Sequence, residues 1–186
     1  RLGYTFISTA IDEVGYLLGG SDGGNYSFTE QNGWAYFEFL SDNDITIDPV
    51  YDNYFEVDQN LYLLDVNSWN GAYSLFKASR SNPSAWEFVH EVPFTGKQYN
   101  GICFASNNFV YVGEGVASVS ERAFMKLDIA TMEWTQIENF RGPLLVRGAT
   151  SFSHNNKGYV GFGLVYNSTL NAVVSKQFWR YDPSIE

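Results

Sequence analysis

A hexamer with a tyrosine at its second position recurs four times along this 186-residue chain. The four copies occupy residues 15–20, 61–66, 110–115 and 158–163. Their tyrosines, Tyr16, Tyr62, Tyr111 and Tyr159, are 46, 49 and 48 residues apart. A fixed period of this size, built from short apolar strands, is typical of the blades of a β-propeller. This spacing restricts the possible folds more than any other feature of the chain.

Each hexamer follows a predicted tight turn at a fixed distance. The positions four and three residues before the tyrosines are 12–13, 58–59, 107–108 and 155–156, and Asn, Asp, Glu and Gln fill all of them. Asn and Asp suit such turns because they tolerate left-handed backbone and bond their own main chain. Three copies also carry a phenylalanine seven residues before the tyrosine, at Phe55, Phe104 and Phe152. We therefore expect each copy to begin with a β-hairpin whose apolar strands lie between neighbouring blades.

Further strands are predicted after each hairpin. Third strands are expected at about 34–40, 73–78, 122–129 and 176–181. Fourth strands are expected at 85–89 and 133–137, with a weak one at 45–47 and none in the last copy. The chain is thus predicted to be one domain with approximate blades at 1–49, 50–95, 96–142 and 143–186, the last lacking its fourth strand.

Composition and charge exclude several classes of protein. Aromatic residues make up 18% of the chain and 17 glycines are present, which fits strands joined by turns. The net charge is −10, and the first 60 residues hold eleven acidic side chains against Arg1 alone, which argues against a nucleic-acid partner. No run of residues is long and apolar enough to predict a membrane span. The single cysteine, Cys103, lies in an apolar pattern and is predicted to be a small buried hydrophobe.

Two of the copies resemble the kelch repeat of β-propellers. The fourth copy matches best, with residues 147–152 leading into 158–163 and then 179–183, and the third copy has Asp128 six residues before Trp134. The resemblance, which extends to secreted bacterial kelch-like and galactose-oxidase-type propellers, implies an all-β propeller of four-stranded antiparallel blades. It also implies an extracellular, periplasmic or cell-surface location. Propellers of this kind usually have more than four blades, so we expect either further blades or self-association to complete the ring.

The candidate site is the face formed by the loops between second and third strands, at about 21–33, 67–71, 116–121 and 164–175, together with the inter-blade connections. Variable loops on a rigid scaffold commonly carry function. Aromatic residues predicted to stack on sugar rings there are Trp34, Trp69, Tyr99 and Tyr166. Basic residues predicted to line the channel mouth and bind a carboxylate or another anion are Lys97, Arg141 and Arg147. The alternative roles are packing between blades for the aromatic residues and a structural role for Arg147.

An acidic segment of the first third offers a possible metal site. Asp42, Asp44 and Asp48 supply the hard oxygen ligands that calcium prefers, although no complete calcium-loop motif is present. The alternative is an acidic surface that serves solubility. No other cofactor is predicted.

These features favour a non-catalytic recognition module that binds a glycan or a protein through the loop-rich face. A carbohydrate-active enzyme, an epimerase or a hydrolase with its site at the propeller axis, is the first alternative. The second is a structural domain of a larger surface protein. His90 and His154 belong to no recognisable catalytic triad or zinc motif, and no motif carries the copper ligands of galactose oxidase.

Overall fold

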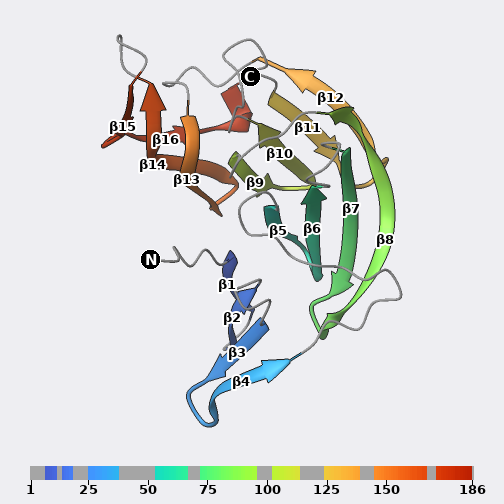
Figure 1. The fold of residues 1–186 in the computed structure, drawn as a ribbon. Helices are drawn as coiled ribbons and strands as arrows, with labels where there is room; N and C mark the ends of the chain where they lie inside the picture. Colours follow the sequence, from blue (N-terminus) through green and yellow to red (C-terminus); the bar gives the residue numbers. More distant parts are fainter. Residues whose placement is uncertain are drawn as a thin grey trace.

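Four small antiparallel sheets stand around a common axis and form a four-bladed β-propeller (Figure 1). This computed structural model describes the backbone of residues 7–11, 14–18, 25–37, 53–66, 72–95, 102–113, 124–138, 145–166 and 171–185. The predicted all-β fold class is confirmed. None of the described residues belongs to a helix long and apolar enough to cross a bilayer.

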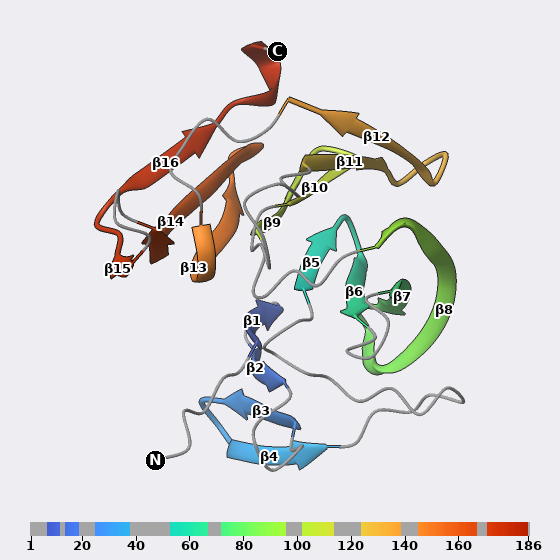
Figure 2. The same ribbon diagram turned by 45° about the horizontal axis from the view of Figure 1, so that its top comes forward.

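The first three blades each contain four strands, paired in sequence order from the axis outward (Figure 2). Blade 1 contains β1 (Ile7–Ile11), β2 (Val14–Leu18), β3 (Asn25–Thr29) and β4 (Gly33–Phe37). Blade 2 contains β5 (Asn53–Val57), β6 (Asn60–Val66), β7 (Ala72–Ser79) and β8 (Asn82–Thr95). Blade 3 contains β9 (Ile102–Ser106), β10 (Phe109–Gly113), β11 (Phe124–Asp128) and β12 (Glu133–Ile137).

The fourth blade is built differently. It contains β13 (Leu145–His154), β14 (Lys157–Tyr166), β15 (Ala172–Val174) and β16 (Phe178–Tyr181), followed by a short 3₁₀ helix, η1 (Pro183–Ile185). Both β15 and β16 pair with the same edge of β14, so together they form one interrupted third strand. The interruption faces Phe162 and Gly163 of β14, which have positive φ values of 61° and 76°. The Phe162 amide donates to the Gln177 carbonyl at 3.0 Å, and the Ser175 amide donates to the Gly163 carbonyl at 2.8 Å, which ties the two segments to β14.

The predicted hairpin turns of blades 2, 3 and 4 are confirmed, and the turn predicted at residues 12–13 lies outside the described residues. Asp58, Asn107, Asn155 and Asn156 all have positive φ, between 49° and 55°. This left-handed conformation is costly for most residues and is tolerated best by Asn and Asp among residues that carry a side chain. The turn residues repeat along the sequence because each blade needs the same backbone reversal.

The predicted strand assignment of the first blade was wrong. Residues 34–40 were expected to form the third strand, but the third strand is β3 and Trp34 lies in the fourth strand, β4. The segment Asn25–Thr29 alternates polar and aromatic residues and was assigned to a long loop, yet it pairs with both β2 and β4. The weak strand predicted at 45–47 lies outside the described residues.

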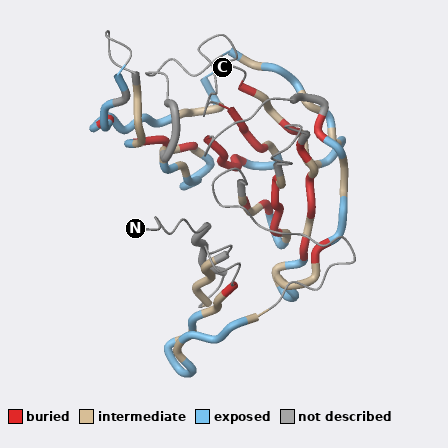
Figure 3. The backbone as a smooth tube through the Cα atoms, viewed as in Figure 1, coloured by how far each residue is buried: buried red, intermediate tan, exposed pale blue. Residues whose placement is uncertain are grey.

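The blades are held together by apolar packing of one sheet face on the next. The ring of Phe55 stacks on that of Tyr62 with centroids 5.2 Å apart, and Phe104 stacks on Tyr111 at 5.1 Å. These stacks form two separate inter-blade clusters. The first joins Phe55 and Tyr62 of blade 2 to the inner strands of blade 3, and the second joins Phe104 and Tyr111 to blade 4. Burial is therefore deepest in blades 2 and 3, which have a neighbour on both sides (Figure 3).

Cys103 belongs to the cluster between blades 2 and 3, as predicted. It is a free cysteine with only 6% of its surface exposed, and burial raises the pKa of its thiol well above the usual range. The protonated thiol acts as a small apolar group in the core.

One glycine of the repeated hexamer is required by close packing between blades. Gly158 is buried, and a Cβ atom placed on it would collide with the ring of Phe104 in blade 3. Gly15 holds the same place in the first hexamer, where the nearest atom to such a Cβ is Phe28 Cβ at an ordinary 3.9 Å. The repeated glycine therefore has a steric role in blade 4 that it lacks in blade 1.

We predict that Gly158→Ala lowers the free energy of unfolding by about 1–3 kcal/mol, the usual cost of overpacking a core. Gly15→Ala is the matched control and is expected to change stability by less than about 1 kcal/mol. Urea denaturation of the two variants and the parent measures both values. Equal effects of the two substitutions would contradict the proposed role of the Phe104 contact.

Candidate functional site

The structure describes only part of the predicted loop face. Arg147 and Tyr166 lie in β13 and β14, near the ends of these strands that are distant from their shared turn, and only their backbones are described. This places both residues at the loop end of blade 4. The other predicted residues, Trp69, Tyr99, Lys97 and Arg141, lie outside the described residues, as do the predicted calcium ligands Asp42, Asp44 and Asp48.

Trp34 is found at the opposite end of its blade. It follows the turn between β3 and β4, and antiparallel pairing puts this turn at the same end as the β1–β2 turn. Its ring lies 5.1 Å from that of Phe28, and 58% of the residue is exposed. The predicted placement of Trp34 on the loop face is therefore wrong, because Asn25–Thr29 forms the third strand and Trp34 lies in the fourth.

The described residues instead border an open cavity on the turn side of the propeller. Its volume is about 570 Å³, and three consecutive blades form its wall through their first hairpin turns. We call it the turn-face cavity. Its lining residues are Glu56, Val57, Asp58, Ala105, Asn107, Asn108, Ser153, His154, Asn155 and Asn156.

Blade packing fixes the relative position of the turns. The Ser151 hydroxyl accepts a hydrogen bond from the Cys103 amide at 3.0 Å and donates one to the Cys103 carbonyl at 2.9 Å. The Ser153 hydroxyl accepts from the Ala105 amide at 2.8 Å. These two serines of β13 thereby satisfy polar groups on the inner edge of β9. The same contacts hold one wall of the cavity against the next.

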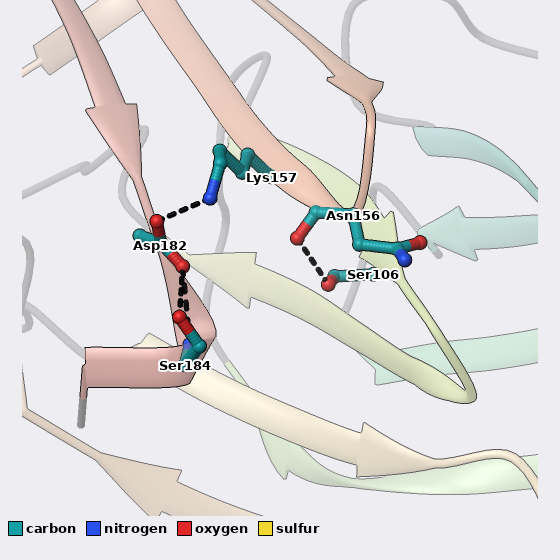
Figure 4. A network of polar contacts seen from close by, with 5 residues as sticks. All are labelled: Ser106, Asn156, Lys157, Asp182 and Ser184. Carbon is teal, nitrogen blue, oxygen red and sulfur yellow. Dashed lines mark hydrogen bonds and ion pairs between the residues drawn. The ribbon is translucent and has the colours of Figure 1, made fainter.

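A further bond joins the turns themselves. The buried hydroxyl of Ser106 donates to the carbonyl of Asn156 at 2.7 Å, as Figure 4 shows. The bond ties the end of β9 to the left-handed turn of blade 4. The Asn155 side-chain amide lies 3.1 Å from Nε2 of His154 at the exposed rim of the same turn. The cavity wall thus includes four Asn side chains, carried by turns with left-handed backbone.

An ion pair secures the neighbouring end of blade 4. Lys157 is the first residue of β14, and its Nζ donates to Oδ2 of Asp182, which lies just beyond β16 (Figure 4). Ser184 donates to Asp182 Oδ1 through its hydroxyl at 2.7 Å and its amide at 3.2 Å. These hydrogen bonds from Lys157 and Ser184 lower the pKa of Asp182 to about 2. The pair holds the interrupted third strand beside the turn that borders the cavity.

The lining of the turn-face cavity is polar and carries acidic groups. Glu56 and Asp58 contribute two carboxylates, whereas none of the lining residues is Lys or Arg. Burial raises the pKa of Tyr62, and the negative charge of the nearby Asp58 raises it further to a lesser degree. Within the part of the chain that the structure describes, no three His, Cys, Asp or Glu side chains gather to hold a metal ion.

Sequence reasoning identified the turn residues but not the cavity. The Asn and Asp pairs were explained by hairpin geometry, and that explanation is correct for each turn taken singly. Their convergence depends on the packing of blades 2, 3 and 4 around the axis. The signal that could have indicated a site is that polar amides recur at one end of strands that are otherwise apolar.

Comparison with known proteins identifies the fold alone. No protein-family model matches the chain, and no curated protein matches its sequence. Among solved structures 107 chains match. One of these, described as the structure of YjhT, has a TM-score of 0.67 and 14% sequence identity, and the match covers 95% of this chain and 68% of that chain. At this identity the likeness supports a shared β-propeller architecture, and the kelch assignment stays a prediction.

The Lys157–Asp182 pair predicts a specific dependence of stability on pH. The pKa of Asp182 in the folded protein, about 2, is below its ordinary value of 3.8. A carboxyl group whose pKa is lower in the folded than in the unfolded protein stabilises the fold at pH values above the unfolded-state pKa. This stabilisation is lost as the pH falls toward the folded-state pKa. We expect the difference in Tm between the parent and Asp182→Asn to be largest above pH 4 and to shrink between pH 4 and pH 2. Ser184→Ala should move this loss to higher pH, and a difference that stays constant across this range would contradict the assignment.

Proposed function

We propose that this protein is a non-catalytic recognition module that binds a neutral glycan in the turn-face cavity. The observation that carries the proposal is the lining of that cavity by amides, a hydroxyl, an imidazole and carboxylates at three hairpin turns. The volume of about 570 Å³ lies within the usual range of ligand pockets.

The side-chain chemistry suits a polyhydroxylated ligand. Each sugar hydroxyl both donates and accepts a hydrogen bond, and an Asn amide offers a donor and an acceptor in one group. The cavity has four such amides, from Asn107, Asn108, Asn155 and Asn156. The carboxylates of Glu56 and Asp58 add strong acceptors for hydroxyl donors.

The charge of the cavity favours a neutral sugar over an acidic one. Two carboxylates line it, and none of the lining residues is Lys or Arg. A uronic or sialic acid would bring its own carboxylate beside these groups, and like charges repel at this range. The anion-binding role predicted for Lys97, Arg141 and Arg147 concerns the other face and stays a separate prediction.

Rigid turns support a binding role because a preformed site loses little conformational entropy when it is occupied. The turn backbones are held in left-handed conformations and by the Ser106–Asn156 bond. The predicted loop face, with Tyr166 and Trp69 among its aromatic residues, remains a second proposed contact surface for a longer glycan or a protein partner.

The proposal is tested by isothermal titration calorimetry with neutral mono- and disaccharides, and with galacturonic and sialic acids as the acidic comparison. We expect a neutral sugar to bind and its acidic counterparts to bind at least tenfold more weakly. Glu56→Gln and Asn108→Ala should each weaken binding about fivefold to tenfold, because the first replaces a charged acceptor by a weaker neutral amide and the second removes a hydrogen bond worth about 1 kcal/mol. Asn108 is chosen because, unlike Asn107, it does not have a positive φ.

Gln136→Ala is the control, since this exposed residue of β12 lies in the outer strand of blade 3. It should leave binding unchanged. Analysis of the sugar after incubation with the protein separates recognition from catalysis, because a recognition module returns the sugar chemically intact. Tight binding of acidic sugars, or binding that Glu56→Gln and Asn108→Ala do not affect, would overturn the proposal for this cavity.

A further inference from the structure

Every junction between blades follows one rule. We call the sheet face that carries the hexamer tyrosine the leading face, and the opposite face the trailing face. Tyr16 on the leading face of blade 1 packs against a cluster on the trailing face of blade 2 that includes Leu61 and Leu63. Tyr62 packs in the same way on blade 3, and Tyr111 packs on blade 4. The leading face of one blade is thus always covered by the trailing face of the next.

The leading face of blade 4 has the same aromatic stack without the cover. Phe152 stacks on Tyr159 with centroids 5.1 Å apart and an interplanar angle of 11°. Its counterparts Phe55 and Phe104 are 5% and 2% exposed, whereas Phe152 is 46% exposed. The stack that is a core element in blades 2 and 3 therefore forms part of the surface in blade 4.

Two more aromatic rings enlarge this surface. Phe178 lies over Gly161, and its ring centroid is 6.1 Å from that of Tyr159 and 5.7 Å from that of Phe162. Phe178 and Phe162 are 48% and 52% exposed. Exposed apolar patches of this kind commonly mark a protein interface.

The trailing face of blade 1 is exposed in the same way. The register pairs Trp34 with Phe28, as it pairs Trp86 with Ala78 in blade 2 and Trp134 with Leu127 in blade 3. Trp34 is therefore the structural counterpart of Trp86. Trp86 is 5% exposed and packs in the cluster that faces blade 1, while Trp34 is 58% exposed.

We propose that two copies of this chain associate head to tail, with the leading face of blade 4 in one copy on the trailing face of blade 1 in the other. The occupant is a second copy because the chain itself carries both halves of the junction that it repeats internally. Core clusters join blades 1 and 2, 2 and 3, and 3 and 4, but within the described residues none joins blade 4 to blade 1. Figures 1 and 2 show these two blades at the two ends of the arc.

Symmetry allows both surfaces of each copy to be used. If each copy offers its blade 4 to the other's blade 1, a two-fold axis relates the copies and both junctions are identical. The assembly would then have twice the four blades of one chain, which is within the usual range of about 4–8 blades for propellers.

Size-exclusion chromatography with light scattering tests the proposal on the intact chain over a range of concentrations. We expect a discrete species with twice the 21.0 kDa mass of one chain. Phe162→Asn should weaken this association at least tenfold, because it removes an exposed ring from the leading face of blade 4. Asn tolerates the φ of 61° at this position, so the variant should still fold, which circular dichroism verifies. Trp34→Gln should weaken association in the same way from the other face.

Phe88→Asn is the matched control, because Phe88 is 49% exposed but lies on β8 of blade 2, away from both end faces. It should leave the dimer intact. Mixing the Phe162→Asn and Trp34→Gln variants should restore a two-copy species, since one junction then pairs two unaltered faces. A monomer at every concentration, a broad aggregate, or a dimer that only Phe88→Asn disrupts would each overturn the proposal.

Discussion

The structure depends on the packing of aromatic stacks between successive blades. A blade is too thin to bury its own side chains, so the Phe55–Tyr62 and Phe104–Tyr111 stacks become core only when the next blade covers them. At about 25 cal/mol per Å² of buried apolar surface, such aromatic residues contribute a large part of the stabilising energy. The small residues opposite them, such as Cys103 and Ala105, leave room for the rings.

This packing also accounts for the polar contacts along the axis. The inner edge of each first strand has backbone groups without a neighbour in its own sheet. Between blades 3 and 4 the hydroxyls of Ser151 and Ser153 fill this need by bonding to Cys103 and Ala105. The serines face blade 3 because they alternate with Phe152, whose ring lies on the other side of the strand. The alternation of Ser and Phe side chains along β13 thus supplies both an aromatic stack and a set of inter-blade hydrogen bonds.

The same arrangement concentrates polar groups at the ends of the strands. Strands buried on both faces leave little polar surface except at the turns, and the turns require Asn or Asp for their left-handed backbone. Around the axis three such turns meet and form the turn-face cavity. The Asn and Asp residues that suit the left-handed turns are therefore also the residues that line the cavity. Sequence identity of 14% with a solved propeller is compatible with this, because the packing needs a pattern of residue sizes rather than particular residues.

The sequence by itself determined the elements that depend on short-range rules. The period of the tyrosines, the apolar hairpins and the Asn and Asp turns are local features, and they predicted the all-β blades and the burial of Cys103. The third strand of blade 1 was missed because Asn25–Thr29 alternates polar and aromatic residues, and only its two neighbouring strands specify it as a strand. Three outcomes were decided by tertiary structure alone: the convergence of three turns on one cavity, the exposure of Phe152 where Phe104 is buried, and the position of Trp34 as the counterpart of Trp86. The physical reason is that repeats with the same residue pattern differ in what lies beside them, and a neighbour in space is not encoded in the repeat itself.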